Sequence, residues 1–430
     1  MTAYILTALS ACLGNVISSI IAGNMIGADA VSAINLSKPV TQFYYTLHLL
    51  LTAGSGMLVA YALGRNSRRE ADTLFTQALC IVTAIALAIT LFAGVFFSEQ
   101  VVLFFCKNRE LYPMSYDYMR PVLLGAPLYI LISSLNTMVA VDGEPRRVSM
   151  AILVDNAVNL LLAPLFIGVF HWGVTSSSVA VIIGHAVGIL ILLSHWRKRA
   201  GEEHLQLRPS GRIFSGERFR HILSAGAPLA VASICLTILL YSANSMVLNA
   251  LGRSGIFVFS VAMNLLMLYN LFLSGSCQTL QSLGAIQVGK QDCEGLRYVI
   301  HKTLRFMTMA MLVLCVAVCV WPEVVVALFG GNGTPELLAD ADHALRIFAV
   351  SFIPFCYIYI VMIIFKLLKH DRLALFISFA LSLTVVAVMA PIAHWAPQAI
   401  WWSYLIAYGI EIAAIYIIMK IRKISLQNIL

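Results

Sequence analysis

The segment 74–98, LFTQALCIVTAIALAITLFAGVFFS, runs for 25 residues without a charged side chain. A helix of about 20 apolar residues crosses the roughly 30 Å hydrocarbon core of a bilayer, so this segment predicts a transmembrane helix. Backbone polar groups in hydrocarbon must pair within the spanning structure, which restricts it to helices or a closed barrel. The alternating ten-residue segments of a barrel are absent. We therefore expect an all-α polytopic membrane protein.

The whole chain has the composition of a membrane protein. Of its 430 residues, 60% are apolar and 11% are charged, and the mean hydropathy is +0.89, whereas about 25% charged residues are usual in soluble domains. A water-soluble core does not accommodate so many apolar side chains. We predict twelve transmembrane helices, at residues 2–22, 38–63, 74–98, 119–141, 149–170, 174–195, 224–250, 256–288, 300–321, 345–367, 373–394 and 399–420.

The two halves of the sequence form a weak internal repeat with an offset of about 225 residues. Matching residues occur in the same order: Gly27 and Gly252, Tyr44 and Tyr269, Gly64 and Gly289, Pro127 and Pro354. Two similar bundles meet at an interface that can open to either side in turn, as in transporters. We therefore predict two pseudo-symmetric six-helix bundles, at 1–195 and 223–430, joined by a cytoplasmic linker with a short amphipathic segment at 196–222.

The distribution of lysine and arginine predicts the orientation in the membrane. Basic residues gather in alternate loops, which contain Arg65, Arg68, Arg69, Arg146, Arg147, Lys290, Arg297, Lys369 and Arg372 besides those of the linker. By the positive-inside rule both termini lie in the cytoplasm, as expected for a multi-pass protein of the inner cell membrane. The net charge of +8 then reflects topology. The expected partners are the lipid bilayer and a small molecule rather than nucleic acid, and we expect a monomer.

No motif of an enzyme or of a metal centre stands out in the sequence. The nine cysteines are scattered, and Cys315 and Cys319 share a helix face without a nearby histidine or carboxylate. A phosphate-binding loop is not visible, so energy would come from an ion gradient rather than from a nucleotide. We therefore expect no catalytic residues and no cofactor besides a coupling ion, H⁺ or Na⁺.

Two motifs point to a known family. The fourth predicted span ends in Asp142-Gly143-Glu144-Pro145, and the fifth closes with the segment 159–168, NLLLAPLFIG. Together with Gly226-Ala227-Pro228 at the start of the seventh span, this pattern resembles the multidrug and toxic compound extrusion (MATE) family. The resemblance implies two six-helix lobes and export of amphipathic, often cationic compounds in exchange for inward protons or sodium ions.

The sequence departs from the family pattern where cations are usually coupled. Ser18 occupies the position of an aspartate in the first span, and Ala163 replaces the aspartate before the proline in the fifth. Ala140 and Thr384 stand near positions where the family carries arginine. The amino-terminal lobe of this sequence therefore lacks the aspartates that the family resemblance implies for cation coupling.

Ionisable residues inside the spans are the remaining candidates for coupling, because a charge in the bilayer costs a few kcal/mol or more and asks for a reason. Asp155 lies next to Asn156 and shares a helix face with Asn159, which would gather several oxygen ligands. Glu411 lies near the middle of the twelfth span, where Lys366 is a candidate structural partner. His48 and His185 are weighed as proton relays, although a lone histidine is more often a packing residue.

The second and eighth spans are predicted to line the substrate cavity. Methionine adapts to varied shapes and aromatic faces attract cations, although such stripes are also common in ordinary packing. The candidates recur at helical spacing or precede Gly289: Gln42, Tyr45, His48, Met263, Met267, Asn270, Gln278 and Gln281.

We therefore predict a secondary active exporter of amphipathic, cationic organic compounds that works by alternating access. One alternative is a flippase for lipid-linked saccharides, which would need basic residues in its cavity, and few lie deep in these spans. A membrane enzyme and a paralogue that has lost transport are the others.

Overall fold

The computed structural model describes residues 16–65, 67–195, 205, 215–290, 292–330, 335–368 and 370–421. Within these ranges the regular structure is helical and contains no strand, which confirms the predicted all-α class. Contacts divide the chain into a first unit, Met1–Tyr241, and a second unit, Ser242–Leu430.

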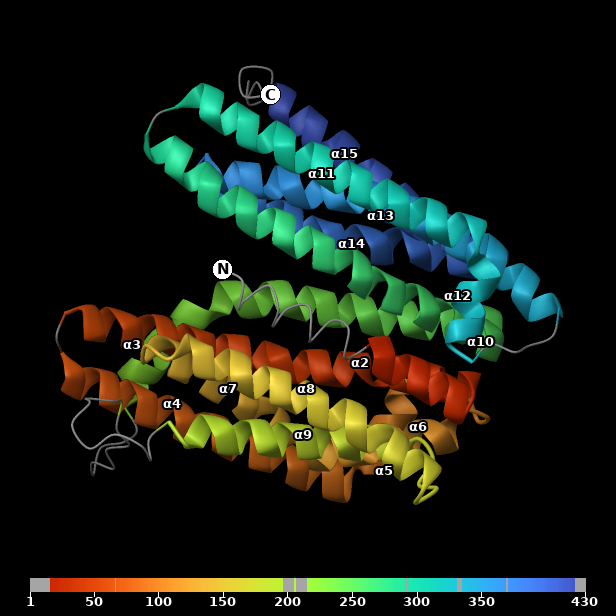
Figure 1. The fold of residues 1–430 in the computed structure, drawn as a ribbon, viewed down its shortest axis with the longest axis horizontal. Helices are drawn as coiled ribbons and strands as arrows, with labels where there is room; N and C mark the ends of the chain where they lie inside the picture. The colour runs from red at the N-terminus through yellow and green to blue at the C-terminus, as the bar shows by residue number, and fades with distance from the viewer. Residues whose placement is uncertain are drawn as a thin grey trace. The chain divides into compact units, whose positions relative to one another are not determined.

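The first unit begins its described part with the short apolar helix Val16–Met25. The elements that follow are α2 (Ala28–His48), the π-helical turn η1 (Leu49–Ala53), α3 (Gly54–Gly64), α4 (Arg68–Ile89), the π-helical turn η2 (Thr90–Phe96), α5 (Ser98–Phe105), α6 (Tyr112–Leu124), α7 (Ala126–Val141), α8 (Pro145–Gly168) and α9 (Thr175–Leu193). Figure 1 shows α8 and α9 side by side, and they pack along their length.

The second unit contains most of the remaining helices. They are the part of α10 (Gly216–Gly289) that follows Tyr241, α11 (Cys293–Val320), α12 (Pro322–Leu328), α13 (Pro335–Leu367), α14 (Asp371–Trp395), the 3₁₀ turn η3 (Pro397–Trp402) and α15 (Ser403–Ile421). Aromatic side chains fill its core, with ring centroids 4.8 Å apart for Tyr269 and Phe352 and 5.2 Å apart for Phe348 and Tyr404.

Nine helices of the described part are long and apolar enough to cross a membrane, and the pair α6 and α7, bent by 52°, would make a tenth span. Eleven of the twelve predicted spans thus have a counterpart or share one. The first, 2–22, lies mostly outside the described residues, and the seventh and eighth run together in α10. The count of twelve stays a prediction.

Two glycines matched by the repeat have the same backbone role. Gly27 lies between helix Val16–Met25 and α2 with a φ of 129°, and Gly252 interrupts α10 with a φ of 66°. Side chains disfavour this region, so glycine permits the chain to turn between successive helices at both places. The matched tyrosines Tyr44 and Tyr269 are both buried. The repeat therefore corresponds to a repeated structural device.

The first part of α10 packs against the first unit. A Cβ atom on Gly54 would lie 2.6 Å from the carbonyl oxygen of Ile222 and 2.7 Å from the nitrogen of Gly226, so the two backbones touch. Ile222, from the predicted amphipathic segment, is fully buried. The contact boundary therefore follows Tyr241, whereas the boundaries 1–195, 196–222 and 223–430 describe the sequence repeat and stay a prediction.

The linker is anchored at two points on the first unit. The Asp142 carboxylate lies 2.7 Å from His195 Nε2 and accepts a hydrogen bond of 3.1 Å from the Leu205 backbone nitrogen. Farther along, Gln77 Nε2 donates to the Ser215 carbonyl oxygen at 3.1 Å. Asp142 belongs to the turn that carries the family resemblance, so this turn also holds the start of the linker.

Candidate functional site

The first unit contains a pair of titratable side chains on neighbouring helices. Asp155 of α8 faces His185 of α9, whose Nδ1 atom lies 2.9 Å from Oδ2 and 3.1 Å from Oδ1 of the carboxylate. The side chains are 13% and 17% exposed, so water reaches them only in part. A carboxylate and an imidazole at this distance can share, accept and release a proton.

Glycines of α9 allow this close approach. A Cβ atom on Gly184 would collide with the side chain and carbonyl of Asp155, and one on Gly188 would lie 2.8 Å from Ile132 Cδ1 and 3.5 Å from Asp155 Cβ. Small residues at a helix interface let the backbones come together in a membrane. The sequence Gly184-His185 thus combines the space for the carboxylate with its partner.

A cavity of about 240 Å³ opens onto the pair. Tyr129 closes one side, with its ring 4.6 Å from the His185 ring in an edge-to-face arrangement, and Tyr44 lies 5.9 Å farther on. The other polar lining residues are Thr41, Tyr45, Ser133 and Asn136. Pockets for drug-sized ligands usually measure about 300–1,000 Å³. This cavity therefore suits a proton, a small ion and a few waters better than an organic substrate.

The other coupling candidates of α8 do not converge on Asp155. Asn156 Nδ2 donates to the Ile152 carbonyl oxygen of its own helix at 2.8 Å. Asn159 Nδ2 donates to Ser18 Oγ at 3.4 Å. Asn159 and Ser18, which replaces the usual aspartate, thus form a contact of their own, and neither Asn156 nor Asn159 lines the cavity.

His48 and Glu411 occupy separate places. His48, at the end of α2, is buried against Tyr45, with ring centroids 5.6 Å apart. Glu411 of α15 is 4% exposed in the second unit, where Thr384 Oγ1 donates to its Oε2 at 3.5 Å. Among the described residues, no salt bridge joins Glu411 to Lys366. The Glu411 carboxylate instead contacts Thr384, which stands near a position where the family carries arginine.

The predicted substrate residues are only partly gathered. Tyr45 lines the 240 Å³ cavity, whereas Gln42 Nε2 donates to Ser233 Oγ of α10 at 3.0 Å and joins two helices of the first unit. Met263 is buried, and Met267 and Asn270 are half-buried, in the part of α10 that belongs to the second unit. The side chains of Gln278 and Gln281 lie outside the described residues.

Sequence reasoning weighed Asp155 and His185 separately and did not pair them. It also missed Tyr129, Ser133 and Asn136 of α7 as lining residues. One available signal was Gly184 next to His185, because glycine in an apolar span marks a close helix contact. Among the described residues, no group of three or more histidines, cysteines or carboxylates lies close enough to hold a metal ion.

Long apolar helices, a repeated glycine turn and a buried carboxylate cavity are the marks of a multi-pass membrane transporter. The chain belongs to the MatE family, whose sequence profile matches residues 3–165 and 228–392. The two matches begin 225 residues apart, at 3 and 228, which agrees with the offset of the repeat. The MATE resemblance is thereby confirmed, and members of this family are transporters rather than enzymes.

Individual relatives are distant. The multidrug export protein MepA of Staphylococcus aureus is 22% identical over 261 residues, which are 60% of this chain and 56% of that protein. An FAD transporter of Shewanella oneidensis is 27% identical over 144 residues, 34% of this chain and 32% of that protein. The aligned part of the chain thus spans about half the length of MepA, and less of the FAD transporter.

A solved structure shows the same fold over the whole length. A multidrug resistance MATE family transporter of the MOP superfamily, in an inward-facing conformation, superposes with a TM-score of 0.85 at 19% identity and covers 99% of both chains. At this identity the likeness establishes the fold, and substrate and coupling must be argued from the residues of this chain.

Proposed function

We propose that the protein is a proton-coupled exporter of amphipathic, cationic organic compounds. The observation that carries the proposal is the Asp155–His185 pair in its small polar cavity, since it supplies a titratable group where the family pattern of this chain lacks its usual aspartates. The MepA match and the MATE fold support export as the direction of transport.

The geometry of the pair favours a proton over sodium as the coupling ion. Both carboxylate oxygens face one imidazole nitrogen, at 2.9 and 3.1 Å. Sodium would have to compete with that nitrogen for the carboxylate, and a protonated imidazole would repel it. A proton instead binds within the pair and leaves it on the other side of the membrane when the cavity opens there.

The cationic substrate is proposed on the same grounds. The cavity is too small to enclose an organic compound, but its carboxylate, which lies beside Tyr44, Tyr45 and Tyr129, attracts positive charge to the cavity mouth. When a proton neutralises the carboxylate, that attraction weakens. Proton entry would therefore promote release of a cationic compound, which couples the two movements in opposite directions.

Dye efflux from proteoliposomes tests the proposal. The purified protein should export a cationic dye when an inward proton gradient is imposed, and an equal sodium gradient at constant pH should give no efflux above a protein-free control. Efflux driven by sodium alone would contradict proton coupling. Absence of efflux under either gradient, with the protein inserted, would identify a paralogue that has lost transport.

The membrane orientation is part of the proposal. We propose that both termini lie in the cytoplasm, because the basic loops alternate along the chain. The proposed location is the inner cell membrane, where we expect the protein to act as a monomer. A fluorescent protein that matures only in the cytoplasm, fused after Leu430, should become fluorescent. A periplasmic enzyme reporter active at the same site would contradict this orientation.

A further inference from the structure

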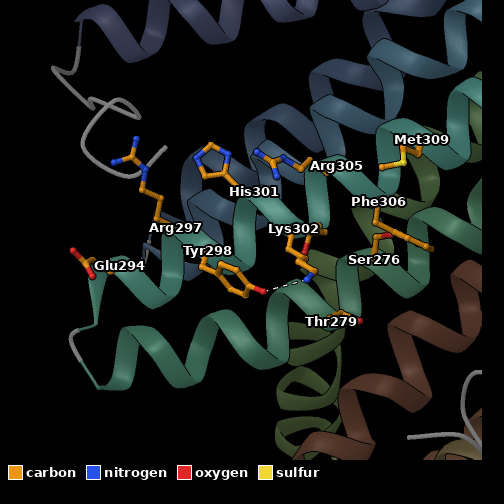
Figure 2. A pocket seen from close by; sticks show the side chains of 11 residues that line it. Ser276, Thr279, Glu294, Arg297, Tyr298, His301, Lys302, Arg305, Phe306 and Met309 are labelled. Atoms are coloured by element: carbon orange, nitrogen blue, oxygen red, sulfur yellow. Dashed lines mark hydrogen bonds between the residues drawn. The ribbon is translucent and has the colours of Figure 1, made fainter.

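The second unit contains a cavity of about 980 Å³ beside the first half of α11 (Figure 2). One row of lining residues follows a spacing of four along the helix: Arg297, His301, Arg305 and Met309. Residues four apart lie above one another on a helix face, so the row forms a ladder with basic groups at one end and an apolar side chain at the other.

A second row beside the first, Tyr298, Lys302 and Phe306, also ends in an apolar side chain. Lys302 Nζ donates to the Tyr298 hydroxyl at 3.1 Å and lies 5.4 Å from the centre of that ring, and Phe306 follows one turn later. The hydrogen bond holds the ammonium group over the cavity rather than letting it extend freely. Figure 2 shows this bond as a dashed line.

The lining has an excess of positive charge. Arg297, Lys302 and Arg305 are basic side chains, and Glu294, in the first turn of α11, is the one carboxylate among the lining residues. Guanidinium and ammonium groups that line one cavity are suited to phosphate oxygens, which accept several charge-assisted hydrogen bonds at once.

A buried hydroxyl on the facing helix has no partner. Ser276 of α10 lines the cavity, is 6% exposed, and its Oγ atom makes no hydrogen bond within the described structure. A buried hydroxyl without a partner costs about 1–3 kcal/mol. An anionic oxygen in the cavity would accept a hydrogen bond from it and remove this cost.

The positive-inside rule alone explains basic residues at the end of a span, but it does not explain their order. Eight residues, a rise of about 12 Å, separate Arg297 from Arg305. Beyond Met309 the exposed side chains of α11 are apolar, as at Leu312, Val313 and Val316. The cavity therefore joins a cationic end to an apolar helix face, which is the pattern that an anionic amphiphile complements.

We propose that this cavity binds an amphiphile with a phosphate group, which contacts Lys302, Arg305 and Ser276, while its apolar part lies against Phe306 and Met309, and Arg297 and His301 add basic side chains at the far end of the cavity. The phosphate belongs either to an anionic lipid or to a soluble phosphate ester. The site is distinct from the Asp155–His185 cavity and does not depend on export, because binding requires no gradient.

Binding of a short-chain phosphatidic acid with a fluorescent acyl group tests this site in the purified full-length protein. The wild type should bind it at least about tenfold more tightly than the matching phosphatidylcholine, which corresponds to about 1.4 kcal/mol. The double variant Lys302→Gln with Arg305→Gln should lose that preference. Lys420→Gln, which removes an exposed charge at the end of α15, should keep it.

Ser276→Ala provides a second measurement in case the double variant folds poorly. It should weaken phosphatidic acid binding about threefold to tenfold and leave phosphatidylcholine binding unchanged, because one hydrogen bond to a charged group is lost. Displacement of the probe by glycerol 3-phosphate would support a soluble ester as ligand. Displacement by anionic lipid alone would support a lipid. Equal affinity for both probes in the wild type, or wild-type preference in the folded double variant, would overturn the proposal.

Discussion

The cavities of the first and second units differ in charge although the units share a repeat. The cavity at the Asp155–His185 pair in the first unit measures about 240 Å³ and contains the carboxylate with its imidazole partner. The cavity beside α11 in the second unit measures about 980 Å³ and is lined by the basic side chains Arg297, Lys302 and Arg305. A duplicated scaffold therefore fixes where helices turn, while the side chains that face the cavities determine the chemistry of each copy.

Removing the charge of Asp155 should have the largest effect. Asp155→Asn keeps the size of the side chain but binds no proton, so proton-driven dye efflux should fall about a hundredfold or more, comparable with loss of an essential acid–base group. Efflux from proteoliposomes at matched protein content provides the measurement. Asp117→Asn, the same change at an exposed position of α6, should retain activity. Normal efflux by Asp155→Asn would remove the first-unit cavity from the mechanism.

His185→Gln should have the next largest effect. Glutamine can still donate a hydrogen bond to the carboxylate but does not titrate between pH 5 and 8, so efflux should fall about tenfold and its dependence on pH should flatten. Efflux rates between pH 5.5 and 8.5 would show this. His221→Gln, an exposed histidine of α10, is the matched control and should keep the wild-type profile. An unchanged profile in His185→Gln would mean that the imidazole only packs.

Gly184→Ala should separate the close contact of α8 and α9. The added methyl group meets the Asp155 side chain and carbonyl, so we expect a loss of about 1–3 kcal/mol in stability, as for other overpacked sites. Thermal unfolding in detergent gives the measurement. Gly409→Ala in α15 is the matched control, because a Cβ atom there meets nothing within 4 Å. Equal melting temperatures for the two variants would argue against a tight α8–α9 contact.

Glu411→Gln should have the smallest effect on transport and thereby sharpens the contrast between units. The described contact of Glu411 is the Thr384 hydroxyl, which a glutamine can also engage, and no cavity described for the second unit includes it. We expect efflux to fall no more than about threefold, below the effect of losing a titrating partner. Thr384→Val serves as a companion variant that removes the same contact. A loss as large as that of Asp155→Asn would place a coupling group in each unit.

Hydropathy predicted most of the fold because a transmembrane helix is a local property of about 20 residues. The repeat was visible because Gly27 and Gly252 have a backbone conformation that glycine favours. The Asp155–His185 pair was not predictable in this way, since it depends on which faces of α8 and α9 meet. Asn159 shows the same limit: its spacing predicts a helix face shared with Asp155, but its contact is Ser18 from another helix.

The basic cavity was missed for a different reason. Arg297, Lys302 and Arg305 lie near the start of the predicted span 300–321, and lysine and arginine are expected at the end of a span from topology alone. The four-residue spacing of Arg297, His301 and Arg305 becomes informative only when Ser276 of α10 is found to line the same cavity. A basic residue at the end of a span can therefore reflect either membrane topology or a binding cavity, and the residues of the facing helix distinguish the two.

The anchoring of the linker has a practical consequence. Leu205 is held by Asp142 and Ser215 by Gln77, so the two residues that flank positions 206–214 both contact the first unit. A foreign domain inserted between these residues would be attached at both ends to the first unit, so it would not have to connect the two repeats. This segment is accordingly the place to insert a tag, a protease site or a fusion partner for imaging without altering the transport path.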